Sequence, residues 1–111
     1  MKVAVIGSRS FNDYAEVKNV LSKINITLLV SGGAIGADSL GEKYAIENNI
    51  PTKIFYPDWE KYGKKAGFIR NTDIIKEAEL VVAFWDNNSK GTLDSLNKAS
   101  ALNKKVLIVN V

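Results

Sequence analysis

Glycines, hydroxyl groups and charged side chains that suit phosphate binding gather in three loops of this sequence. One loop holds Gly32, Gly33 and Gly36, followed by Asp38 at the start of a helical segment. Glycine has no Cβ, so the backbone can turn sharply and approach a ligand closely, and the free amides at a helix N-terminus attract anions. We therefore predict that this loop binds phosphate, although it matches neither a Walker A loop nor a strict dinucleotide-binding fingerprint. The alternative is that the glycines only form a tight turn.

A second loop repeats this chemistry after the fourth apolar run. It contains Asp86, Ser89, Gly91 and Thr92. We expect Gly91 to provide backbone freedom and Thr92 to cap the helix that follows, so that the first amides of this helix point toward the same ligand. The alternative is an ordinary polar turn with a helix cap.

A cation follows the first apolar run, in the loop Gly7-Ser8-Arg9. Arg9 and Arg70 are the only arginines among fifteen basic residues, and both fall in segments predicted to surround one site. A guanidinium suits bidentate contacts with phosphate, so we expect both arginines to neutralise the ligand. The alternative is a structural ion pair with Asp38 or Asp86.

Aromatic and lysine residues are concentrated in residues 56–67. Trp59 or Tyr62 is placed to stack on a base, and the lysines of this segment to attract an anion. The alternative is that the aromatic rings form a hydrophobic lid over the edge of the sheet.

Five apolar runs alternate with four helix-like segments. The runs are residues 3–6, 27–30, 53–56, 80–85 and 106–109. They are continuous, as expected for strands buried on both faces of a parallel sheet. The predicted helices carry apolar stripes at Tyr14, Val17, Leu21 and Ile24, at Leu40, Tyr44 and Ala45, at Phe68, Thr72, Ile75 and Ala78, and, in a helix from 92 to about 103, at Leu93, Leu96 and Ala99.

This alternation predicts an α/β fold: a single Rossmann-like, doubly wound, parallel five-stranded sheet with helices on both faces. The longest connection joins the third and fourth strands, where the chain must cross back over the sheet, and this gives the strand order 3-2-1-4-5. Ligands bind such sheets at the carboxyl ends of the strands, beside strand one. No linker is visible, so we expect residues 1–111 to form one domain.

The composition excludes several kinds of chemistry. The chain has no cysteine and no histidine, which rules out zinc sites of those residues, cysteine nucleophiles and Ser-His-Asp triads. We expect no metal site and no required cofactor; Mg²⁺ accompanying a phosphate ligand is compatible with the sequence.

No apolar run is long enough for a signal peptide or a membrane span, so we expect a cytoplasmic protein. No final helix follows the fifth strand, and the apolar surface left there predicts a homodimer.

These residues together resemble the SLOG superfamily, which joins the DprA/Smf group with the LOG cytokinin-activating phosphoribohydrolases, and within it the small YspA-like, YpsA-related branch. The motifs that carry the resemblance are Gly7-Ser8-Arg9, Ser31-Gly32-Gly33-Ala34-x-Gly36-Ala37-Asp38, Trp59-x-x-Tyr62-Gly63, Ala66-Gly67-x-x-Arg70-Asn71, Ala83-Phe84-Trp85-Asp86 and Ser89-x-Gly91-Thr92. The resemblance implies a Rossmann-like fold and a nucleotide-type ligand. Its relatives include lyases of the N-glycosidic bond, sensors of NAD-derived signals and DNA binders.

We expect a binding or sensing module for a nucleotide derivative, such as an ADP-ribose-like or NAD-like molecule. In this hypothesis the loop glycines and Thr92 bind phosphate, Arg9 and Arg70 neutralise it, and Asp38 and Asn71 hold the ribose.

Hydrolysis of a nucleotide N-glycosidic bond is the first alternative. The resemblance implies a catalytic glutamate three residues after Thr92, but Ser95 stands there and Asp94 precedes it. Arg70 and Asp94 are the candidate catalytic pair, because a carboxylate must stabilise the sugar cation or activate water. The carboxylates available for this role are Asp94, Asp86 and Asp38.

Binding of single-stranded DNA is the second alternative. It combines a basic groove with stacking aromatic rings, and Lys61, Lys64 and Lys65 motivate it. A net charge of only +3 makes it the least favoured of the three hypotheses.

Overall fold

The computed structural model describes all of residues 1–111, and its five strands form one parallel sheet in the order β3-β2-β1-β4-β5. The predicted fold class and strand order are confirmed. The elements in chain order are β1 (Lys2–Gly7), α1 (Tyr14–Leu21), β2 (Leu28–Ser31), α2 (Ala37–Glu47), β3 (Thr52–Ile54), α3 (Trp59–Tyr62), a 3-10 turn η1 (Gly63–Lys65), α4 (Ala66–Glu77), β4 (Leu80–Trp85), α5 (Lys90–Ala101) and β5 (Lys105–Asn110).

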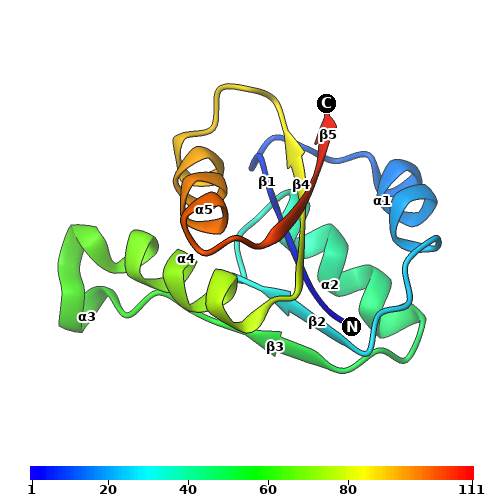
Figure 1. Cartoon of the computed structure of the whole chain (residues 1–111), viewed down its shortest axis with the longest axis horizontal. Helices are drawn as coiled ribbons and strands as arrows, with labels where there is room; N and C mark the ends of the chain where they lie inside the picture. The colour runs from blue at the N-terminus through cyan, green and yellow to red at the C-terminus, as the bar shows by residue number, and fades with distance from the viewer.

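The central strand β1 explains why the apolar runs are continuous. It pairs with β2 on one side and β4 on the other, and its side chains alternate between the two faces of the sheet. Val3 and Val5 pack on the face that α1 and α2 cover, while Ala4 and Ile6 pack on the face of α4 and α5. Figure 1 shows these helix pairs on opposite sides of the sheet. Both faces of β1 are therefore buried.

Two apolar cores hold the helices against the sheet. The core under α1 and α2 consists of Val3, Val5, Val17, Leu21, Ile26, Leu29, Ala37, Tyr44, Ala45, Val82 and Phe84. The core under α4 and α5 consists of Ala4, Ile6, Val30, Ile74, Ile75, Ala78, Val81, Ala83, Leu96 and Ala99. Together they anchor both helices that begin at the carboxyl ends of β2 and β4.

The buried face of α4 differs from the predicted stripe. Ile75 and Ala78 are buried as expected, but Phe68 is 49% exposed and Asn71 is buried instead. An amide is tolerated inside because it is hydrogen bonded there: Asn71 Nδ2 donates to Asp94 and to the carbonyl oxygen of Gly91. Counting apolar residues alone therefore misplaced this face. On α5, Leu93 is likewise exposed.

Two boundaries in the second half of the chain also differ from prediction. The connection before α4 contains α3, a short helix that the sequence analysis did not predict; the carboxylate of Asp58 caps it by accepting from the amide of Lys61 at 3.1 Å. Helix α5 begins at Lys90 rather than at residue 92. Ser89, not Thr92, is its cap, since Ser89 Oγ accepts from the amide of Thr92 at 3.3 Å.

The two edge strands are less buried than predicted. The polar residues Thr52 and Lys53 of β3 are exposed. On β5, Val106, Leu107 and Ile108 are 37%, 42% and 44% exposed, because no helix fully covers either face of this strand. None of the helices is long and apolar enough to cross a membrane.

Candidate functional site

A cavity of about 530 Å³ lies at the carboxyl ends of β1 and β4, between the starts of α2 and α5 and the side of α4. Hydroxyl, amide and charged groups dominate its lining, which consists of Ile6, Gly7, Ser8, Arg9, Ser10, Ala34, Asp38, Arg70, Asn71, Ile74, Asp86, Asn88, Ser89, Lys90, Gly91, Thr92 and Ser95. The loops after β1 and β4 meet here as predicted, at the switch point of the sheet.

The glycine-rich loop after β2 was expected to present its amides to a ligand, but three of these amides are hydrogen bonded within the protein. The amides of Gly32 and Ala34 donate to Asp38 Oδ2 at 3.1 and 3.4 Å, and the amide of Gly33 points to Ser31 Oγ at 3.4 Å. The carboxylate of Asp38 thus occupies the position in which a phosphate was predicted. The amides of Gly32 and Gly33 are therefore already used within the loop, which argues against direct phosphate contacts from these two glycines, whereas the amide of Gly36 makes no hydrogen bond.

Asp38 is the one cavity carboxyl whose ionisation is made difficult by its surroundings. Burial raises the pKa of Asp38 to about 6, even though the amides of Ala34 and Gly32 and the positive charge of Arg70 act to lower it. The neighbouring Glu42 raises it further. Desolvation outweighs three favourable interactions because the side chain is almost fully enclosed. Its second oxygen, Oδ1, makes no hydrogen bond.

Arg70 connects the loop after β2 to helix α4. Its Nη1 donates to the carbonyl oxygen of Gly32 at 2.5 Å and its Nε donates to Asn71 Oδ1 at 3.0 Å. Burial lowers the pKa of Arg70; Asp38 raises it and Arg9 lowers it. A Cβ at Gly32 would lie 2.7 Å from Arg70 Nη1 and 2.9 Å from Asp38 Oδ2, so an alanine there would have to displace one of these side chains.

Arg9 is exposed and makes no hydrogen bond or ion pair in the structure. Arg70 forms no ion pair either, since the three ion pairs are Lys2–Glu77, Lys53–Glu77 and Lys98–Asp94. The alternative interpretation of the arginines, a structural ion pair with Asp38 or Asp86, is therefore not what the structure contains. Arg9 and Arg70 thus line one cavity and form no ion pair, although the charge of Asp38 lies close enough to Arg70 to raise its pKa.

The start of α5 supplies free backbone donors. Thr92 and Leu93 donate their amides to Ser89, whereas the amides of Lys90 and Gly91 have no protein acceptor. Asp86 Oδ1 accepts from the amides of Asn88 and Ser89, and these two bonds lower the pKa of Asp86. The loop is thus ordered by its own side chains and leaves two amides for a ligand.

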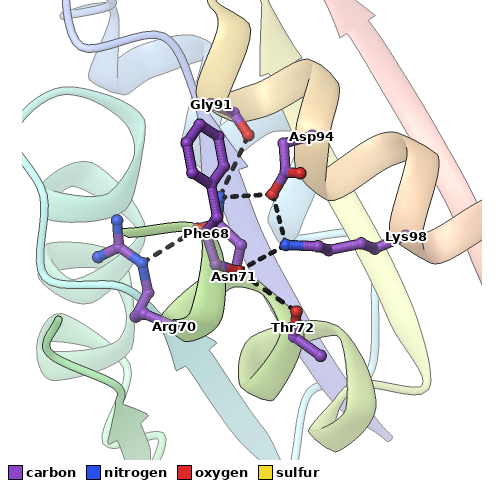
Figure 2. A network of polar contacts seen from close by, with 7 residues as sticks. All are labelled: Phe68, Arg70, Asn71, Thr72, Gly91, Asp94 and Lys98. Carbon is purple, nitrogen blue, oxygen red and sulfur yellow. Dashed lines mark hydrogen bonds and ion pairs between the residues drawn. The ribbon is translucent and has the colours of Figure 1, made fainter. Parts of the chain in front are cut away.

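A hydrogen-bonded network ties α4 to α5 behind the cavity (Figure 2). Asn71 stands at its centre, bonded to Arg70, to Gly91 and to Asp94 Oδ2, which also accepts from Lys98 Nζ at 2.7 Å. Asp94 does not line the cavity, and its carboxylate is paired with Lys98. The candidate catalytic pair of Arg70 and Asp94 is therefore connected only through Asn71.

Four predicted ligand-binding residues lie outside the main cavity. Trp59, Gly32 and Gly33 line a second, smaller cavity of about 280 Å³ beside it. Gly36 lines neither; it is the residue before α2, with φ of 82°. No group of three acidic side chains is arranged to hold a metal ion.

Four polar residues that line the cavity were not predicted as ligand-binding: Ser10, Asn88, Lys90 and Ser95. Ser95 could have been predicted to line the cavity, because it lies three residues after Thr92 and shares its helix face. Lys90 could have been predicted as well, because it is the first residue of a helix that follows a loop at the site.

The fold is Rossmann-like, and the match to a family model assigns the chain to the SLOG class. The model of the YspA, cpYpsA-related SLOG family (YAcAr) matches residues 1–62. The "Gene 61 protein" of Mycobacterium phage D29 is 30% identical over 109 residues, covering 88% of this chain and 87% of that protein. The chain belongs to the YspA, cpYpsA-related SLOG family.

A solved structure has the same fold at low sequence identity. DNA processing protein A (DprA) from Streptococcus pneumoniae superposes with a TM-score of 0.83 and 21% identity. The match covers 99% of this chain and 50% of that one, so the chain spans about half the length of this structural relative.

Proposed function

We propose that the protein binds a phosphorylated small molecule of the nucleotide class in the main cavity. The observation that carries this proposal is the pair of arginines, Arg9 and Arg70, that share a polar cavity and form no ion pair. Like charges placed together favour an anion between them, and guanidinium groups match phosphate oxygens in geometry.

The phosphate belongs at the start of α5. The amides of Lys90 and Gly91 are free there, the helix contributes partial positive charge, and both arginines line the same cavity. The glycine-rich loop is not the phosphate site in this proposal, because the carboxylate of Asp38 already accepts the amides of Gly32 and Ala34.

The sugar belongs on the side of Asp38. Asp38 Oδ1 is free to accept a hydroxyl group, whereas Asn71 already uses its amide nitrogen for Gly91 and Asp94 and its oxygen for Arg70. We therefore propose that Asp38 contacts the ribose. Asn71 instead holds Arg70 in place.

Replacement of Arg9 by alanine tests the phosphate site. Arg9 makes no contact that stabilises the fold, so Arg9→Ala should keep the melting temperature and lose about 1.5–3 kcal/mol of binding free energy for AMP or ADP-ribose. Lys23→Ala, which removes the same charge from an exposed position outside both cavities, is the matched control. Calorimetric titration measures both, and equal affinities in the two variants would contradict the proposal.

Cleavage of the N-glycosidic bond is the second candidate, and Asp38 is the observation that favours it. With its pKa raised to about 6, this carboxyl retains a proton closer to neutrality than an ordinary aspartate, and a protonated carboxyl can donate to the departing base while water attacks the sugar. Chromatography after incubation with AMP decides between the candidates. Intact AMP supports binding alone, and free adenine with ribose 5-phosphate identifies a hydrolase.

A further inference from the structure

Asp38 and Arg70 both contact Gly32 of the glycine-rich loop. The amide of Gly32 donates to Asp38 Oδ2, and its carbonyl oxygen accepts from Arg70 Nη1. A Cβ at Gly32 would lie within 3 Å of both side chains, so the two charged groups are close neighbours. Both also line the main cavity. The positive charge of Arg70 is therefore available to Asp38 within the protein and to a bound anion on the cavity side.

These two demands on Arg70 compete. The charge of Arg70 lowers the pKa of Asp38, so part of the stability of the Asp38 carboxylate comes from this one cation. An anion that binds beside Arg70 offsets that charge and brings a second negative charge into the cavity, where partly buried charges are screened less than charges in water. An ionised Asp38 and a bound anion therefore disfavour each other.

The other charged groups around Asp38 do not remove this conflict. Glu42, one turn further along α2, is negative and raises the pKa of Asp38. Arg9, Asp86 and Lys90 line the same cavity from the loop after β1, the loop after β4 and the start of α5. Two backbone amides lower the pKa of Asp86, so Asp86 stays ionised where Asp38 titrates. Asp38 is the cavity group that can change its charge.

The composition leaves Asp38 without the usual competitors for a proton near pH 6. Burial raises the pKa of Asp38 to about 6, and the chain contains no histidine and no cysteine. The N-terminal amino group donates to the carbonyl oxygen of Asn25, at the opposite end of β1 from the cavity. A change in anion affinity between pH 5 and pH 8 would thus report on Asp38.

We propose that the main cavity takes up a proton from solvent when it binds an anion, and that Asp38 receives this proton. The proton goes to Oδ1, because Oδ2 accepts two amides of the loop and Oδ1 has no partner. A hydroxyl group can donate to an ionised Oδ1 and accept from a protonated one, so the proposed ribose contact survives in both states. This inference rests on the proposed function, since it needs the anion in the main cavity.

Sulfate is the probe, because it stays divalent from pH 5 to pH 8 and has neither base nor sugar. In NMR titrations at constant ionic strength, the amides of Lys90 and Gly91 report sulfate binding and the carboxyl carbon of Asp38 reports its own protonation. The affinity for sulfate should fall roughly tenfold from pH 5 to pH 8, and saturating sulfate should raise the titration midpoint of Asp38 by about one pH unit. Each effect is the thermodynamic consequence of the other.

Three variants assign the proton. Asp38→Asn keeps an oxygen for the two amides but cannot titrate, so its affinity for sulfate should not change with pH. Asp86→Asn is the matched control: it removes a different carboxylate from the same cavity and should keep the pH dependence of wild-type protein. Glu42→Gln keeps an acceptor for Ser31 Oγ and should move the profile to lower pH, because Glu42 raises the pKa of Asp38.

The outcomes separate this inference from the proposed function. Sulfate that binds equally well at every pH, or with the same pH dependence in Asp38→Asn, would refute proton uptake by Asp38 and leave the phosphate site standing. Sulfate that shifts neither amide of α5, or binds unchanged to Arg9→Ala, would overturn both. If Asp38→Asn does not fold, the carboxyl titration of wild-type protein decides: a midpoint that saturating sulfate does not move refutes the inference.

Discussion

At the scale of single residues, the site is organised around the buried carboxylate of Asp38, which takes the position that a bound anion would otherwise occupy. Asp38 accepts two backbone amides of the glycine-rich loop and has a neighbouring cation in Arg70, yet burial keeps its pKa high. A phosphate in the same place would meet repulsion from Asp38. In the proposed function, a phosphate therefore uses the donors that the protein leaves free, at Arg9 and at the start of α5.

The raised pKa of Asp38 predicts a specific dependence of stability on pH. Its folded pKa of about 6 exceeds the ordinary value of 3.8, so the folded state binds the proton more tightly than the unfolded state does. The resulting contribution to stability is fully present below about pH 4 and is lost as the pH rises to about 6, by up to roughly 3 kcal/mol. The charged groups acting on this titration are Arg70 and Glu42.

Asp38→Asn isolates this contribution. The asparagine oxygen can accept the same two amides but does not titrate. The free energy of unfolding of the variant minus that of wild-type protein should increase between pH 4 and pH 7, as measured by urea denaturation. Other carboxylates titrate equally in both proteins and cancel. A difference that stays constant with pH would refute the assignment.

At the scale of elements, the turn into α2 depends on one backbone conformation. Gly36 has φ of 82°, and a Cβ there would clash with the carbonyl oxygen of Ser8 and lie 2.6 Å from that of Arg9. Both neighbours are backbone atoms of the loop after β1, so they cannot move aside without moving the cavity wall. Gly36 thus lets two loops of the site pack together, although it does not line the cavity.

Gly36→Ala should lower the free energy of unfolding by more than about 2 kcal/mol, because the new methyl group meets strain and a backbone clash together. Gly91→Ala is the contrasting variant: its Cβ would meet no atom within 4 Å, and in helix α5 it should be neutral or up to about 1 kcal/mol more stable. Urea denaturation of both variants measures the difference. Similar stabilities would show that the Gly36 turn is not constrained.

At the scale of the whole molecule, the sheet has two unlike edges. The edge at β3 is short and carries polar residues such as Lys53, a common protection against pairing with other chains. The edge at β5 is six residues long and exposes Val106, Leu107 and Ile108. We propose that β5 pairs with β5 of a second copy, which would satisfy the unpaired backbone groups of both strands and cover their apolar side chains.

Leu107→Lys should convert such a dimer into a monomer, because a charge placed on each strand would repel its counterpart across the twofold axis. Ile46→Lys is the control, since Ile46 is 74% exposed on α2 and lies away from β5. Light scattering at micromolar concentration measures the mass of each variant. A monomeric wild-type protein would refute the pairing.

The architecture was accessible from the sequence because it follows from local patterns. Strands buried on both faces produce continuous apolar runs, so the ends of β1 and β4 were predicted to within one residue. The long connection before α4 indicated the strand order. The loops after β1, β2 and β4 were predicted to surround one site because, in any sheet of this order, they meet at one edge.

The contacts inside the site were decided only by the tertiary structure, because they join residues far apart in the chain. Arg70 bonds to Gly32 across 38 positions, and Asn71 to Asp94 across 23. No local pattern indicates that Asp38 would accept the amides of the glycine-rich loop. Nor does one indicate that Asp94 would pair with Lys98 outside the cavity, or that the arginines would form no ion pair. The sequence by itself determined which loops line the cavity; distances in the folded chain decided which of their polar groups have no partner within the protein.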